Sequence, residues 1–183
     1  QAMPSILIQR GVGGKDYQET GPEYPFFVQV RQTEATPLLI TTSRVYTTEK
    51  MTVPGIGTGA AYASGQAFGG KFFITVPKEG TISNVWFLDY DDEGIPKEIA
   101  LFTRDFTATA DKSAFSVSAG DLANSLGLVE IGTFYDFTAT QLGAATPALW
   151  YNAQEGRIYC QVKTKGADNI AAGSIPQIVM VIA

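Results

Sequence analysis

The most regular stretch of this sequence is Arg157-Ile158-Tyr159-Cys160-Gln161-Val162-Lys163-Thr164, in which apolar and polar side chains alternate. Successive side chains of a β-strand point to opposite faces of the sheet, so a period of two predicts a half-buried strand. Ile158, Cys160 and Val162 would share its buried face, which makes Cys160 a small core residue. A framework of sheets is therefore expected.

Outward from this stretch, several other short segments have the same strand character. In 72–76, Phe72, Ile74 and Val76 fall on one face, and Pro77 would end the strand. In 80–90 both faces are apolar, with Ile82 and Trp86 on one and Phe87 on the other, which indicates a strand near the middle of a sheet with Trp86 packed inside. Further strands are predicted at 98–103, 114–118, 128–134 and 177–182.

Only one segment has the features of a helix. In 118–127, Ser118 can cap the amino end, Leu122 and Leu126 are four residues apart, and Gly127 can end the helix. Many short strands and one short helix predict an all-β fold, a β-sandwich, with jelly-roll connectivity as one option.

The first part of the chain differs from the rest. Strand-like pieces at 26–31 and 38–42 are separated by segments rich in glycine and proline, such as 54–59. So long and interrupted a connection is unusual inside a compact domain. We therefore expect 1–58 to be an extended N-terminal arm and 59–183 to be the sandwich; the alternative is that 26–31 supplies an edge strand to that sandwich.

Composition restricts the functions that are open to this chain. It has 183 residues, no histidine, one cysteine and a net charge of -5. Without histidine, a Ser-His-Asp triad or a histidine-ligated zinc site cannot be built. The excess of acids disfavours nucleic acid as a partner, and the apolar runs are far too short to span a membrane. No enzyme activity and no cofactor are expected.

The motifs that imitate known sites are incomplete. Asp89-x-Asp91-x-Glu93-Gly94 resembles the start of a calcium loop, but its twelfth position is Ala100, where a bidentate Glu is required. Acids near predicted strand ends could in principle form a glycosidase pair, although their spacing is not specific. These acids are Asp105, Asp111, Glu130 and Asp136.

Aromatic residues are the better candidates for contact with a partner. Tyr24, Phe26 and Phe27 lie close together in the expected arm, which has little core of its own, and Ile6 and Ile8 precede them. These five residues are the predicted partner-binding set. Trp150 and Tyr151 suggest an alternative, because exposed rings can stack on sugars.

From residue 59 onward, several weak motifs follow one another along the chain. They are 59–70, Ile82 with Val85 and Asp89, 99–102, 111–117, 121–129, 158–164 and the apolar end of the chain. This succession, which covers about two thirds of the chain, resembles structural proteins of tailed bacteriophages. Gln66 stands where the opening motif of that group usually has an acid.

This resemblance implies a virion component, namely a decoration or cement protein on the outer surface of a phage head. Its partner would be the major capsid protein, and such proteins often form homotrimers. The resemblance agrees with a sandwich plus an arm that orders on assembly. A carbohydrate-binding sandwich is the main alternative function, and a carboxylate glycosidase is the third.

Overall fold

The computed structural model describes residues 8–10, 16–18 and 45–183, and it divides the chain into two units between Thr42 and Ser43. In the first unit, β1 (Ile8–Arg10) and β2 (Asp16–Gln18) form an antiparallel pair, with Gln9 opposite Tyr17. No pattern in the sequence predicts this pair. The strands predicted at 26–31 and 38–42 lie outside the described residues.

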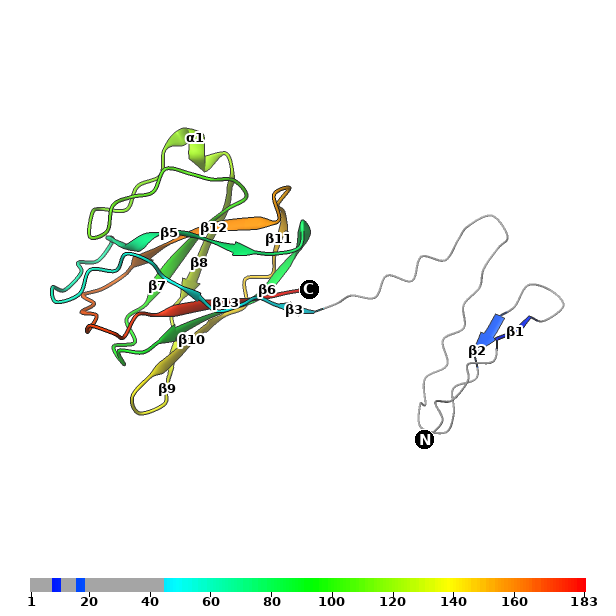
Figure 1. Cartoon of the computed structure of the whole chain (residues 1–183), viewed down its shortest axis with the longest axis horizontal. Coiled ribbons are helices and arrows are strands. Elements are labelled where there is room, and N and C mark those ends of the chain that lie inside the picture. The colour runs from blue at the N-terminus through cyan, green and yellow to red at the C-terminus, as the bar shows by residue number, and fades with distance from the viewer. Residues whose placement is uncertain (1–7, 11–15, 19–44) are drawn as a thin grey trace. The chain divides into compact units, whose positions relative to one another are not determined.

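The second unit is an all-β sandwich of two antiparallel sheets (Figure 1). The seven-stranded sheet has the order β3-β13-β6-β10-β9, with β4 also beside β13 and β11 also beside β6. Its strands are β3 (Tyr46–Thr47), β4 (Met51–Thr52), β6 (Glu79–Asp89), β9 (Phe134–Asp136), β10 (Gln141–Ala145), β11 (Leu149–Asn152) and β13 (Gln177–Ile182).

The four-stranded sheet has the order β5-β12-β7-β8. It consists of β5 (Ala67–Thr75), β12 (Arg157–Thr164), β7 (Lys97–Phe102) and β8 (Ser125–Ile131). The fold class and the strands at 72–76, 98–103, 157–164 and 177–182 are thus confirmed in outline. Jelly-roll connectivity stays a prediction.

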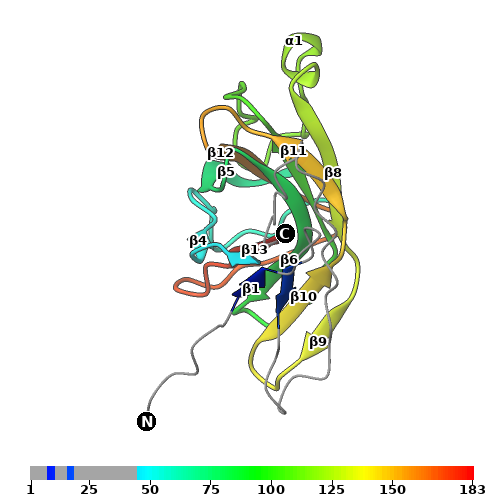
Figure 2. The same cartoon turned by 90° about the vertical axis from the view of Figure 1, so that its right-hand side faces the viewer.

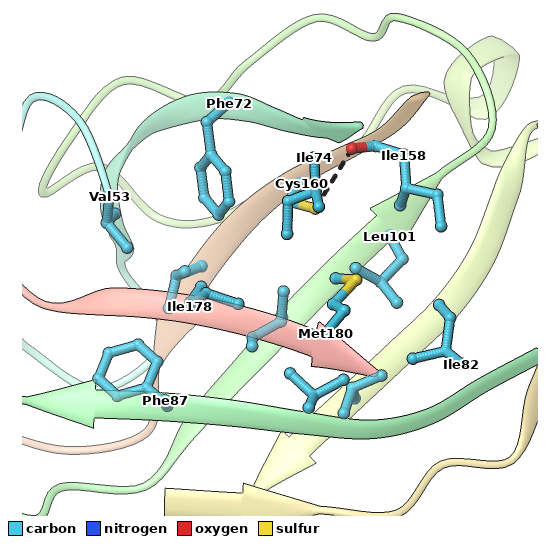
Figure 3. Packing of buried hydrophobic residues seen from close by; sticks show 14 of the residues in the cluster. Val53, Phe72, Ile74, Ile82, Phe87, Leu101, Ile158, Cys160, Ile178 and Met180 are labelled. Carbon is cyan, nitrogen blue, oxygen red and sulfur yellow. Dashed lines mark hydrogen bonds between the residues drawn. The ribbon is translucent and has the colours of Figure 1, made fainter. Parts of the chain in front are cut away.

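The core lies between the two sheets (Figure 3). Ile74, Leu101 and Ile158 enter it from the four-stranded sheet, and Phe87 and Met180 from the seven-stranded sheet. All five side chains are at most 1% exposed. Each fully buried apolar side chain of this size contributes about 1.5–3 kcal/mol to folding, so this layer is the main source of stability.

β12 is more deeply buried than its alternation predicts. Ile158, Cys160 and Val162 face the core as expected, but Tyr159 and Gln161, on the opposite face, are buried too. The connection 103–118 covers this face: Gln161 Nε2 donates to Thr109 O at 2.6 Å, and its Oε1 accepts from Thr109 N at 3.0 Å. β12 is therefore covered on both sides.

The expectation that Trp86 packs inside is wrong. Val85, Phe87 and Ile82 are fully buried, whereas Trp86 is only half-buried. The pairing of β6 with β13 shifts by one residue here, from Val181 opposite Asn84 to Ile182 opposite Ile82. This bulge places Ile82 on the core side together with Phe87, although they are an odd number of residues apart.

The helix is shorter than expected. α1 (Ala119–Leu122) is a single turn, capped by Ser118, whose Oγ accepts a hydrogen bond from Asp121 N at 3.0 Å. The cap is confirmed, but Leu126 and Gly127 belong to β8, because the chain leaves the helix to pair with β7. α1 lies at the opposite end of the sandwich from β9 (Figures 1 and 2).

Two further expectations are corrected. No strand forms at 114–118, where the described chain makes only an isolated bridge between Ala114 and Gln66. The segment 45–58, assigned to the arm from the sequence, belongs to the sandwich unit, because β3 and β4 pair with β13 and Val53 is fully buried. Within the described residues, no helix is long and apolar enough to cross a membrane.

The first prediction concerns the close approach of the two sheets at Gly143 of β10. A Cβ there would lie 2.9 Å from Phe134 Cε1 and closer still to Ile131 Cγ2. Gly143→Ala should lower the free energy of unfolding by roughly 1–3 kcal/mol through overpacking, measured by urea denaturation. Gly132→Ala is the matched control, since its nearest neighbour would be 3.7 Å away. Equal stability of the two variants would contradict this packing.

Candidate interaction surface

The structure describes only part of the predicted partner-binding set. Ile8 lies in β1, while Ile6, Tyr24, Phe26 and Phe27 lie outside the described residues. Their role therefore stays a prediction.

The two rings of the glycan-binding alternative are not both accessible. In β11, Trp150 is 64% exposed, but Tyr151 is fully buried. Its two neighbours along the strand, Trp150 and Asn152, are exposed, as expected when successive side chains point to opposite faces. Burial raises the pKa of the Tyr151 hydroxyl to about 12. Tyr151 is thus a core residue, which corrects the expectation of an exposed pair.

The four acids considered for catalysis each have a separate structural partner. Asp105 pairs with Lys71, whose ammonium donates to it and lowers the pKa of that carboxyl. Glu130 pairs with Lys165, and Asp136 accepts from Thr138 N at 2.6 Å. Asp111 accepts from Tyr62 Oη at 2.8 Å and from the amides of Gly57 and Gly69. These contacts hold turns, loops and neighbouring strands in place, so each of the four acids has a structural role.

Asp89, the first residue of the calcium-like motif, also has a structural role. Its two carboxylate oxygens accept from Asp91 N at 2.9 Å and Gly94 N at 3.0 Å, which closes the turn between β6 and β7. Among residues 45–183, no group of three acidic or thiol side chains is arranged to hold a metal ion.

A hollow of about 510 Å³ opens beside β8, lined by Leu126, Leu128, Pro147 and Leu149 among others. Glu130 is the only charged residue in its lining. The hollow therefore lacks the paired carboxylates that glycoside hydrolysis requires.

The outer face of the seven-stranded sheet carries two rows of mainly apolar side chains. Residues opposite one another in antiparallel strands lie on the same face, so the register defines two rows across it. We call these rows the outer face. One row is Gln177, Leu88, Leu142 and Tyr135, and the other is Val179, Trp86 and Ala144.

The outer face has no Lys, Arg, Asp or Glu in either row. Its one amide, Gln177, is occupied, because Oε1 accepts from Tyr90 Oη at 3.0 Å. Tyr135 is 59% exposed, Leu88 and Leu142 are half-buried, and Val179 is only 5% exposed. β9 and β10, which carry Tyr135 and Leu142, lie side by side at one end of the sandwich (Figure 2). An uncharged, partly exposed apolar sheet face is typical of a protein interaction site.

The other sheet presents a different outer face. The connection 103–118 covers part of it, where Phe102 and Phe106 stack with ring centroids 4.1 Å apart. Beyond that cover, ion pairs join Glu98 to Lys163 and Glu130 to Lys165. The two outer faces therefore differ in kind: one is covered and charged, and the other is apolar.

Comparisons with known proteins identify no relative: no family model matches the chain, and no significant similarity to a curated protein or to a solved structure was found.

The second prediction concerns Cys160, which the sequence placed in the core. Its side chain is fully buried, with Sγ 3.6 Å from Ile158 O (Figure 3), and burial raises the pKa of the thiol. Because the thiolate is the reactive form, native Cys160 should not react with a disulfide reagent such as DTNB. Its reaction should appear with urea in step with unfolding. Rapid reaction of the native protein would contradict this placement.

Proposed function

We propose that this chain is a non-enzymatic adhesion protein, and specifically a decoration protein on the outer surface of a phage head. The observation that carries the proposal is the outer face: a rigid sandwich presents an uncharged apolar surface suited to another protein. The resemblance of residues 59–183 to phage structural proteins supplies the class of partner, which is the major capsid protein.

The proposed mechanism is attachment by many copies. Each copy would bury part of its outer face and its N-terminal residues against the capsid lattice, and main-chain pairing would extend a sheet edge. Ordering of an arm costs conformational entropy, so each single contact is weak. A closed oligomer, with a trimer favoured, would bind through several contacts at once, and attachment would then be effectively permanent.

The third prediction tests the N-terminal residues. Removal of 1–36 should leave a folded protein, because the described core lies in 45–183, but it should abolish co-sedimentation with purified phage heads. Circular dichroism and light scattering would check the fold and the oligomeric state of the truncated chain. Binding at the full-length level would rule out a role for the arm.

The fourth prediction tests the outer face. Tyr135→Asp introduces a charge that would be desolvated at the interface, and it should weaken head binding about tenfold or more, since about 1.4 kcal/mol corresponds to that factor. Leu122→Asp is the matched control, because Leu122 is 62% exposed and lies on α1 at the other end of the sandwich. Equal losses in both variants, or none in either, would contradict the assignment of this face.

A carbohydrate-binding module is the second candidate, and the 64% exposure of Trp150 is the observation that favours it. A flat, exposed indole can stack on a sugar ring. A glycan array would then show saturable binding that Trp150→Ala removes, whereas Tyr135→Asp would leave it unchanged. If no glycan binds, the carbohydrate-binding candidate is ruled out and adhesion to a protein partner remains.

A further inference from the structure

The core contains one pair of ionisable side chains that neither the fold nor the proposed function explains. Lys97 is the first residue of β7, and Asp168 lies in the connection that follows β12. Each is only 1% exposed, and Lys97 Nζ lies 2.6 Å from Asp168 Oδ2. Charged side chains are rarely buried this completely, because removing each from water costs several kcal/mol.

The contact leaves one oxygen of the Asp168 carboxyl group without a partner. Lys97 Nζ lies against Asp168 Oδ2 and also donates to Ile95 O at 2.6 Å. Within the described part of the chain, no group is placed to donate a hydrogen bond to Asp168 Oδ1. The amine is therefore held against a carboxyl group whose second oxygen is buried and unsatisfied, which is costly.

Both partners are held in place by other parts of the fold. Lys97 pairs with Thr164 across β7 and β12. The backbone of Asp168 is fixed by a hydrogen bond from Tyr62 N to Asp168 O at 2.7 Å, and the next amide, of Asn169, donates to Glu93 Oε2 at 2.8 Å. Such fixed geometry raises the effective concentration of one group at the other by many orders of magnitude.

Burial opposes the charged form of each group. It lowers the pKa of Lys97, although the charge of Asp168 opposes this shift. Burial also raises the pKa of Asp168 to about 6, although the charge of Lys97 opposes that shift in turn. Lys97 Nζ lies 5.1 to 5.9 Å from the ring centroids of Phe68, Phe87 and Phe134. These rings attract the ammonium form, but they also exclude water from the site.

We propose that Lys97 and Asp168 condense into an intramolecular amide bond, so that this pair is a site of self-catalysed covalent cross-linking. The lone pair of the neutral Lys97 amine attacks Cγ of the protonated Asp168 carboxyl, and a C–N bond forms. The C–O bond to the hydroxyl group then breaks, and the hydroxyl leaves as water with a proton released by Nζ. No oxidant, reductant or cofactor is required.

The cross-link would replace two buried charges with one neutral amide. It would also close the chain between β7 and the connection after β12, and so constrain the unfolded state as a disulfide does. The only cysteine, Cys160, cannot supply such a constraint within one chain. This inference does not rest on the proposed function, because it concerns the core alone.

The experiment is the intact mass of the purified full-length protein by electrospray mass spectrometry. The cross-linked chain should be lighter than its sequence mass by one water, and proteolysis should yield a branched peptide that contains both Lys97 and Asp168. Lys97→Arg should restore the full sequence mass, because a guanidinium is not a nucleophile at neutral pH. Asp168→Asn should instead lose one ammonia and reach the same final mass as the cross-linked wild type.

The matched control is the pair Lys163–Glu98, whose side chains are 27% and 16% exposed. Lys163→Arg should leave the loss of one water unchanged. The decisive measurement uses the wild-type chain, so misfolding of a variant cannot obscure it. Full sequence mass and no branched peptide in folded wild-type protein would overturn the proposal and leave Lys97 and Asp168 as a buried ion pair.

Discussion

Burial of one apolar layer between two sheets is the interaction on which every other feature of the described sandwich depends. The layer requires strands that direct one face inward, and it brings the sheets so close at Gly143 that no side chain fits beside Ile131 and Phe134. Because the inner faces are used entirely for this packing, binding can take place only on outer faces, edges and loops. This explains why the acids considered for catalysis are found as loop anchors and surface ion pairs.

The two outer faces show how such a body can be asymmetric. The outer face of the four-stranded sheet is partly covered by the connection 103–118 and bordered by ion pairs. The two rows of the outer face of the seven-stranded sheet contain no charged side chain. In a chain with a net charge of -5, an uncharged face of this kind reduces the repulsion that another acidic surface would meet. The asymmetry therefore suits a protein that attaches by one side.

The Lys97–Asp168 pair is the exception within the apolar layer. Two ions in this environment lose much of their hydration energy, and their attraction compensates only when their remaining hydrogen bonds are satisfied, which is not the case for Asp168 Oδ1 among the described residues. The pair is thus either a cost to the fold or the starting point of a reaction that removes the charges. The closely held geometry, together with burial that opposes the charge on each group, favours the second interpretation.

The sequence by itself determined the fold class, the core-facing side of β12, the cap at Ser118 and the burial of Cys160, because these follow from local alternation and local hydrogen bonds. Of the candidate site, it singled out no residue of the outer face, because the rows of that face are set by the pairing of β6 with β10 and β13 and of β10 with β9. Only the tertiary structure decided that Trp86 points outward, because a bulge reverses the alternation of β6. It alone also brought Lys97 to Asp168, because proximity between residues far apart in the chain depends on how strands pair, and no local pattern records that pairing.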